Sequence, residues 1–156
     1  MAVNRGKSFE GIVREAFEQV PDTLVYRLHD DMSGFKGVKN PCDFLLYRKP
    51  NMYAIECKAT NKTSLPFANI TDFQWEHLLK MSKEKGVVAG ILCWYVAFDV
   101  TVFIPIQRLQ ICKEEGWKSI NHVKAVSLPD VFVIPGRKKR IFFDYDMQSF
   151  FEHFSS

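Results

Sequence analysis

Two acidic residues and a lysine lie at a spacing that could hold a metal ion beside a phosphate group. Asp43 is followed, thirteen residues later, by the tripeptide Glu56-Cys57-Lys58. On a β-strand, Glu56 and Lys58 leave the same face and Cys57 points to the opposite face. If Asp43 and Glu56 lie on the two strands of a hairpin, their carboxylates are close enough to share one cation.

These residue types suit the hydrolysis of a phosphodiester bond. Carboxylate oxygens are the ligands that Mg²⁺ prefers, and the bound ion lowers the pKa of water and neutralises charge on a phosphate. Lys58 would orient the attacking water and stabilise the negative charge of the transition state. The alternative interpretation of Glu56 and Lys58 is a surface salt bridge, which is common and weak. The apolar neighbours of both residues favour a site.

Basic residues are clustered along the chain, although the formal net charge of +3 says little about partners. The polar segment 60–64 follows Lys58 at once and offers hydroxyl, amide and ammonium groups to a phosphate backbone. We expect six residues to contact the phosphates of a nucleic acid: Arg5, Lys7, Lys36, Lys39, Lys62 and Thr63. A solvated surface face is the alternative, and it applies equally to the basic run at residues 137–140.

The elements that must position these residues begin with a hairpin. Residues 43–47 and 52–59 are predicted to be strands, and the turn-like segment 48–51 joins them. A further strand is expected over residues 23–29, followed by an unusually long loop over residues 30–41. Asp43 at the start of one hairpin strand and Glu56 near the end of the next would then lie side by side.

Helical periodicity flanks the hairpin. Residues 8–20 are expected to form an amphipathic helix with Ser8 as its N-cap, and residues 71–85 a second helix with Thr71 or a neighbour as its N-cap. Other expected elements are strands at 87–98, 100–106, 131–134 and 141–144, a helix at 107–115, a basic turn at 135–140 and a C-terminal helix ending at Phe154. This order indicates an α/β fold with a mixed sheet.

Length and composition are those of one globular domain, which we expect to span residues 1–156. The four cysteines form no CxxC pair and lie mostly in apolar runs, so we expect reduced, buried thiols. The start of the chain carries charges and no apolar segment typical of a leader, and no later window is apolar enough to span a membrane. These features favour a cytoplasmic location without membrane attachment.

The motifs described above resemble the RecU-type Holliday junction resolvases, within the PD-(D/E)XK nuclease superfamily. The resemblance runs from Asn4 to about Leu79, which is half of the chain. Its most specific part lies between Glu56 and Gln74. The segments that carry it are Asn4-Arg5-Gly6-Lys7 with Glu10, Asp43-Phe44, Glu56-Cys57-Lys58, Thr60-Asn61-Lys62-Thr63-Ser64-Leu65-Pro66-Phe67, and Gln74 with Glu76-His77-Leu78.

The resemblance implies a restriction-endonuclease-like fold, in which a mixed central sheet is flanked by helices. It also implies that Asp43, Glu56 and Gln74 bind a catalytic Mg²⁺, or Mn²⁺ in its place, and that Lys58 stabilises the transition state. Glu10 is similar to the acidic helix residue of the wider resolvase group. On residue chemistry alone, Gln74 would be a helix-surface glutamine and Glu10 a favourable acid in a first helical turn.

The implied activity is Mg²⁺-dependent cleavage of four-way DNA junctions by a homodimer, because two matched cuts need a twofold pair of sites. Phe150, Phe151 and Phe154, or the Trp94-Tyr95 strand, could form the dimer interface or belong to the core.

Two departures from the resemblance bear on the DNA substrate. Pro41 stands where RecU enzymes typically carry a threonine, and Gly34, Lys36, Gly37 and Lys39 stand in place of their long stalk. The small size suits a phage-encoded member. Two alternatives to a resolvase remain, namely a PD-(D/E)XK endonuclease that cuts linear duplex DNA and a DNA-binding module without catalysis.

Overall fold

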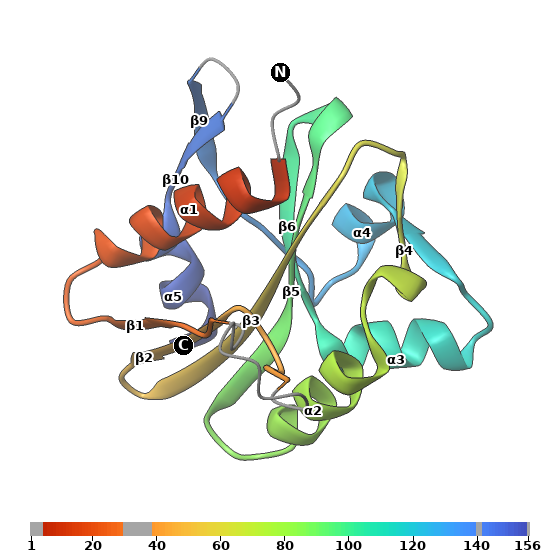
Figure 1. Cartoon of the computed structure of the whole chain (residues 1–156), viewed down its shortest axis with the longest axis horizontal. Coiled ribbons are helices and arrows are strands. Elements are labelled where there is room, and N and C mark those ends of the chain that lie inside the picture. The colour runs from red at the N-terminus through yellow and green to blue at the C-terminus, as the bar shows by residue number, and fades with distance from the viewer. Residues whose placement is uncertain (1–4, 30–38, 140–141, 156) are drawn as a thin grey trace.

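The computed structural model of the chain describes residues 5–29, 39–139 and 142–155, the side chains of residues 5–8 and 142 excepted. At its centre is a six-stranded sheet with the strand order β1, β2, β3, β5, β6, β8 (Figure 1). Among these strands, β3 and β5 run parallel and the other neighbouring pairs are antiparallel. The bounds are β1 Leu24–Arg27, β2 Phe44–Arg48, β3 Asn51–Thr60, β5 Val87–Tyr95, β6 Val100–Pro105 and β8 Phe132–Val133.

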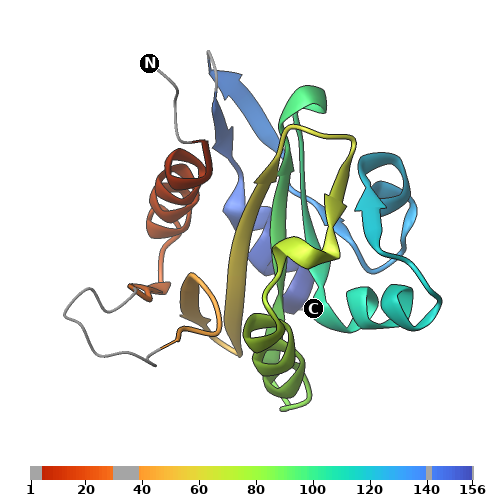
Figure 2. The same cartoon turned by 45° about the vertical axis from the view of Figure 1, so that its right-hand side comes forward.

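Helices flank both faces of the sheet. The helices are α1 Arg5–Glu18, α2 Asp72–Ser82, α3 Ile106–Glu114, α4 His122–Ser127 and α5 Met147–Ser155. Figure 2 shows α1 on one side of the sheet and α3 and α4 on the other. Helices α1 and α5 contribute to one buried cluster, and α2, α3 and α4 contribute to a second. The expected α/β fold, a mixed central sheet flanked by helices, is confirmed.

The central strands are apolar on both faces because each face packs against one of these clusters. In β5, Leu92 and Trp94 belong to the cluster beneath α1 and α5, whereas Ile91 and Cys93 belong to the cluster beneath α2 and α3. The same alternation in β3 places Cys57 on the α1 side. Glu56 and Lys58 therefore leave the sheet on the α2 side, as the i and i+2 spacing predicts.

Shorter elements complete the fold. β4 Ser64–Pro66 pairs with β7 Ser119–Asn121, and β9 Gly136–Lys139 pairs with β10 Phe142–Tyr145. Two short 3₁₀ turns are η1 Phe67–Asn69, which leads into α2, and η2 Val96–Phe98, which follows β5. Within the described residues, no helix is long and apolar enough to cross a membrane. The four cysteines are free and buried, as expected.

The expected long elements are confirmed. Strands β2 and β3 form the predicted antiparallel hairpin, with Phe44 opposite Ile55, and β5 and β6 form the second. The strand expected over residues 87–98 ends at Tyr95, and its last three residues are the 3₁₀ turn η2. The helix expected over residues 71–85 is α2, and Thr71 is its N-cap. The strand over 23–29, the helix over 107–115 and the C-terminal helix are also present with shifted ends. Residues 30–38 of the expected long loop lie outside the described residues.

Two local predictions are wrong, namely the N-cap at Ser8 and the basic turn at residues 135–140. Helix α1 begins at Arg5, so Ser8 lies inside the helix and is not its N-cap. Most of the basic turn expected at 135–140 is strand β9, which no apolar pattern marks because all four of its residues are exposed.

The aromatic residues considered for a dimer interface belong mainly to the core. Phe150, Phe151, Trp94 and Tyr95 are at most 1% exposed, so of their two expected roles they fill that of core residues.

Candidate active site

Asp43 is fixed against the middle of β3 just before β2 begins. Its backbone N–H donates to the carbonyl of Ile55 at 3.1 Å, and its Oδ2 accepts from the backbone N–H of Cys57 at 2.9 Å. The regular β2–β3 pairing stops at Phe44 and Ile55. Beyond this point the Asp43 side chain, and not a backbone carbonyl of β2, accepts the hydrogen bond from the Cys57 N–H. The carboxylate lies next to Glu56, as hairpin geometry predicts.

Glu56 is a buried carboxylate, 5% exposed, on the α2 side of β3. Its Oε2 accepts from Lys58 Nζ at 3.1 Å and from Gln74 Nε2 at 3.0 Å. Its Oε1 is fully buried and has no hydrogen-bond partner within the described part of the chain. Burial, and then the neighbouring charge of Asp43, raise the pKa of Glu56 to about 7, although Lys58 opposes this shift.

Gln74 connects Glu56 to the start of α2 through a capping box. Thr71 Oγ1 accepts from the backbone N–H of Gln74 at 3.1 Å, and Gln74 Oε1 accepts from the backbone N–H of Thr71 at 3.2 Å. This reciprocal pair leaves Gln74 Nε2 directed at Glu56. An amide nitrogen is not a metal ligand, so coordination by Gln74 requires its amide to turn and present Oε1.

Arg27 is a site residue that the sequence did not indicate. Its Nη2 lies 2.7 Å from Glu10 Oε2 and 3.3 Å from Asp43 Oδ1, so one guanidinium bridges two carboxylates. Its Nη1 also donates to the carbonyls of Leu28 and Asp43. Arg27 ends β1 opposite Phe44, so the pairing of β1 with β2 brings it one position from Asp43, and no local sequence pattern marks it.

Glu10 reaches the site from α1, where it is partly buried beside Arg27. Burial, and next the charge of Asp43, raise the pKa of Glu10, while the hydrogen bond from Arg27 lowers it. Three carboxylates therefore converge with two cations, Arg27 and Lys58. All five residues expected to be catalytic, Glu10, Asp43, Glu56, Lys58 and Gln74, lie in this one network.

The network suits a hard divalent cation. Asp43 and Glu56 are neighbouring carboxylates, and the buried Glu56 Oε1 gains a partner if a cation binds there. Among the described residues, no three His, Cys, Asp or Glu side chains are grouped so as to hold a metal. The protein would thus supply two carboxylates and leave positions for water and phosphate oxygens, as is usual for Mg²⁺.

The structure describes the side chains of only three of the six residues expected to contact DNA. Lys62 and Thr63 are exposed in the connection between β3 and β4, and Thr63 accepts a backbone hydrogen bond from His122 at 3.2 Å. Lys39 is exposed, with its Nζ 5.9 Å from the centre of the Phe73 ring of α2. Lys36 and the side chains of Arg5 and Lys7 lie outside the described residues.

The basic run is engaged in ion pairs where it is described. Lys138 pairs with Asp99, and Lys139 pairs with Asp144 at 3.5 Å. These pairs lie on exposed surface, in and beside the small β9–β10 sheet, and both cations remain accessible to solvent.

Fold and site together define an α/β protein that gathers carboxylates and a lysine at the end of a β-hairpin. A family model described as RecU, recombination protein U, matches residues 32–134, and the chain belongs to this family. The family expected from the residues is thereby confirmed, and with it the expected kind of activity, that of a Holliday junction resolvase.

Other comparisons add little. No curated protein matches the chain. A solved structure of Hjc from Archaeoglobus fulgidus, described as a Holliday junction resolvase from an archaeal hyperthermophile, is similar at 20% identity and a TM-score of 0.47. The similarity covers 67% of this chain and 75% of that one, and it is too weak to assign a role to any residue.

Proposed function

We propose that this RecU-family protein cuts four-way DNA junctions by metal-dependent hydrolysis at the site formed by Asp43, Glu56 and Lys58. The observation that carries the proposal is the buried Glu56 carboxylate, whose Oε1 has no partner among the described residues while Asp43 lies beside it. Burying two acids together is costly for stability unless a proton or a cation compensates them.

Each residue of the network has a distinct task in this proposal. Asp43 and Glu56 hold the cation, which when bound lowers the pKa of water and neutralises charge on the phosphate. Lys58, whose Nζ is 3.1 Å from Glu56, orients the attacking water and stabilises the charge that develops on phosphate oxygens. Gln74 holds Glu56 from the α2 side and, with its amide turned, would add an oxygen ligand.

Glu10 and Arg27 are positioning residues in this proposal and do not bind the cation. Arg27 bridges Glu10 and Asp43 and so sets the orientation of a proposed metal ligand. Lys39, Lys62 and Thr63 are exposed and would contact the DNA backbone, together with Arg5, Lys7 and Lys36.

We further propose that Mg²⁺ is the ion, that Mn²⁺ can replace it, and that the protein acts as a homodimer. Two matched cuts across a junction need two sites related by a twofold axis, which a dimer provides. The four unpaired thiols are consistent with a reducing compartment, which supports a cytoplasmic location.

Cleavage of a synthetic four-way junction, measured beside a linear duplex of the same sequence, tests the proposal. With Mg²⁺ we expect symmetric cuts in the junction, and a loss of at least about a hundredfold in rate for Asp43→Asn and for Lys58→Ala, since each removes charge from the reaction centre. Asp130→Asn and Lys80→Ala, which change the same residue types outside the network, should cleave as the parent does.

Other outcomes separate the alternatives. Cleavage of the linear duplex as fast as the junction would indicate a different endonuclease on this fold. Tight binding of both DNAs without cleavage in either Mg²⁺ or Mn²⁺ would indicate a DNA-binding module. If Asp43→Asn cleaved at the parental rate, the assignment of the site would be wrong.

A further inference from the structure

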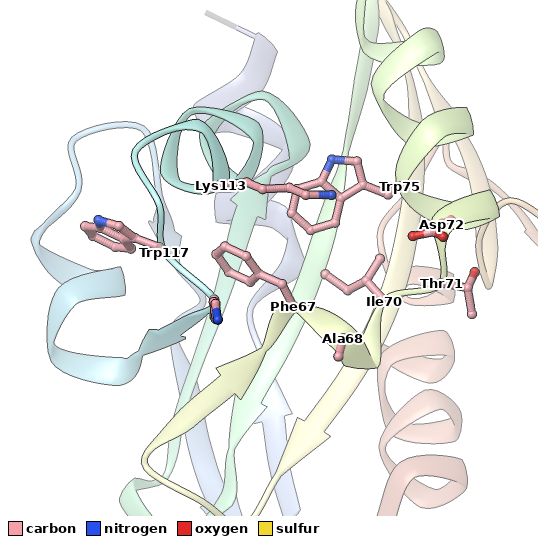
Figure 3. Close-up of a pocket in the computed structure, with 9 residues that line it drawn as sticks. Phe67, Ala68, Ile70, Thr71, Asp72, Trp75, Lys113 and Trp117 are labelled. Carbon is pink, nitrogen blue, oxygen red and sulfur yellow. The ribbon is translucent and has the colours of Figure 1, made fainter.

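A pocket of about 550 Å³ lies where η1 and the start of α2 face the end of α3. Figure 3 shows Phe67 between Trp117 on one side and Trp75 on the other, with the Trp117 ring pointing away from Phe67 and Lys113 extending over the Trp75 ring. Pockets of about 300 to 1,000 Å³, apolar and with a few polar groups, are the kind that bind small organic groups.

The pocket wall is aromatic and held in place. The rings of Phe67 and Trp75 lie 5.4 Å apart at 58°, and Trp75 Nε1 donates to Gln110 Oε1 at 2.6 Å, which fixes the indole. Phe67 and Trp75 are mostly buried, whereas Trp117 is partly exposed. The accessible ring is therefore that of Trp117, whose centre lies 5.1 Å from Lys124 Nζ, and an accessible indole is suited to stack on a planar, unpaired base.

Charged groups surround this wall. Lys113 Nζ lies 4.7 Å from the centre of the Trp75 ring, and Lys113 and Lys118 are both exposed. Either ammonium group could bind the phosphate of a nucleotide whose base is in the pocket. Asp72, also exposed, can accept a hydrogen bond from an amino or ring N–H group of a base.

The pocket is linked to the candidate active site by two hydrogen bonds. Thr71 lines the pocket, its backbone N–H donates to Gln74 Oε1 at 3.2 Å, and Gln74 Nε2 donates to Glu56 at 3.0 Å. The Thr71 edge of the pocket therefore adjoins the candidate active site, so that one DNA strand can pass from one to the other.

We propose that this pocket binds one unstacked nucleotide of the DNA substrate, with the base against the Trp117 ring and its phosphate on Lys113 or Lys118. The inference rests on the proposed function, because it makes the pocket a subsite of the same DNA. A four-way junction whose branch point opens offers such a base, whereas an intact linear duplex does not. The pocket thus contributes selectivity for unpaired DNA beside the cutting site.

Binding without cleavage tests this subsite. Affinities for a labelled oligothymidylate and for a duplex of equal length are measured in EDTA by fluorescence anisotropy. Trp117→Ala should weaken binding of the single strand about tenfold, the usual effect of losing one stacked base. Lys113→Gln, which keeps the aromatic wall, should weaken it about threefold and reduce its salt dependence. Duplex affinity should stay within about twofold of the parent for both variants.

Matched controls lie on the β2–β3 hairpin, away from the pocket. Tyr47→Ala removes an exposed aromatic ring and Lys49→Gln an exposed lysine, and both should bind the single strand as the parent does. Thermal unfolding of each variant checks that it is folded. The pocket proposal is overturned if Trp117→Ala and Lys113→Gln bind the single strand with parental affinity, or if duplex binding falls equally.

The two proposals fail in different ways. Asp43→Asn should abolish cleavage without weakening single-strand binding in EDTA, because it removes a negative charge beside the phosphate. A parent protein that binds single strands through the pocket but cleaves nothing would contradict the nuclease and support the subsite. A protein that cleaves junctions, with pocket variants that bind as the parent does, would contradict the subsite alone.

Discussion

At the scale of single residues, Glu56 is the group whose state depends most on what binds beside it. Its carboxylate is buried, one of its oxygens has no partner among the described residues, and Asp43 adds a second negative charge. Without a metal, a proton shared between the two acids relieves this repulsion. Metal and proton therefore compete for the same place, and pH should control that competition.

The first prediction concerns this competition. The pKa of Glu56 is raised from 4.5 to about 7, so the folded protein binds this proton more tightly than the unfolded chain. In EDTA, the contribution of Glu56 to the free energy of unfolding should be fully present below pH 4.5. It should be lost as the pH rises through about 7. Mg²⁺ should raise the unfolding temperature at pH 8 more than at pH 5.5, which calorimetry can measure.

The variant Glu56→Gln tests whether Glu56 causes this pH dependence of stability. The amide has no proton to lose, so the variant should show a flatter pH profile in EDTA and little response to Mg²⁺. Glu152→Gln, on the exposed face of α5, should keep the parental profile. A parental profile in Glu56→Gln would show that another group is responsible.

The second prediction concerns Arg27. Removing its guanidinium in Arg27→Ala leaves Glu10 and Asp43 without the cation that bridges them, so Asp43 should lose its orientation. Misplacement of a ligand by about 1 Å can cost about a hundredfold in rate, and we expect a loss of that order in single-turnover cleavage. Arg27→Lys keeps the charge without the planar fork and should lose less.

Two features of the Arg27 measurement distinguish positioning from stability. Excess Mg²⁺ should restore part of the rate of Arg27→Ala, because the defect lies in a ligand. Arg14→Ala removes an exposed arginine of α1 that pairs with Glu18, and its cleavage should match the parent. If Arg27→Ala cleaves at the parental rate, the bridge has no role in the reaction.

These residues are not equally predictable from the sequence. Asp43, Glu56 and Lys58 were predicted because their spacing is local to one hairpin, where strand periodicity fixes which side chains meet. Gln74 and Glu10 became candidates only through the family resemblance, since a helix glutamine or glutamate is ordinary on chemistry alone. Arg27 has no such signature, because its partners are 16 and 17 residues away and are brought to it by packing of α1 and β1.

At the scale of elements, the start of α2 contributes both to the stability of the helix and to the geometry of the candidate site. Thr71 caps the helix, and the same hydrogen bonds orient Gln74 toward Glu56. The Thr71 cap was predicted from the sequence because a threonine before an amphipathic pattern is a local signal. Its link to Glu56 was not, since that contact crosses 18 residues of chain.

The third prediction follows from this cap. Thr71→Ala should cost about 0.5 to 2 kcal/mol of unfolding free energy, because the backbone N–H of Gln74 loses its acceptor. Cleavage should fall as well, since Gln74 is no longer held by a reciprocal pair. Thr71→Ser keeps the hydroxyl and should retain both properties, as denaturant unfolding and cleavage rates will show. Loss of stability with unchanged cleavage would mean that the cap does not position Gln74.

Short elements were the part of the fold that the sequence could not predict. β4 and β7 are three residues each and are stabilised by pairing with one another across more than fifty residues of chain. β9 has no buried residue, so its lysines and arginine resemble a solvated turn until β10 pairs with it. Long strands such as β5 were predictable because burial on both faces requires a continuous apolar run.

At the scale of the whole molecule, the sheet lies between two buried clusters. The candidate site lies just beyond the point where the regular pairing of β2 with β3 ends. The division of residues 1–156 into one domain and the assembly of two chains into a dimer both stay predictions. The dimer surface must involve residues other than Phe150, Phe151, Trp94 and Tyr95, because these are enclosed in the core of one chain.

The fourth prediction concerns Gly90, which sits in β5 between the two clusters. A Cβ at this position would lie 2.3 Å from the carbonyl oxygen of Ile104 and 2.8 Å from the Phe103 ring, so β6 would have to move. Overpacking of this kind costs about 1 to 3 kcal/mol or more, and each kcal/mol lowers the unfolding temperature of a chain of this size by about 2 to 4 °C. Gly90→Ala should therefore unfold several degrees below the parent.

Gly11→Ala is the matched control for this substitution. A Cβ at Gly11 meets nothing within 4 Å, and the residue is exposed inside α1, so alanine should stabilise the helix by about 0.5 to 1 kcal/mol. The same chemical change is thus expected to have opposite signs at the two glycines, and calorimetry of both variants compares them directly. Equal unfolding temperatures for Gly90→Ala and the parent would mean that β5 and β6 are not packed as closely as the register of Ile91 with Ile104 requires.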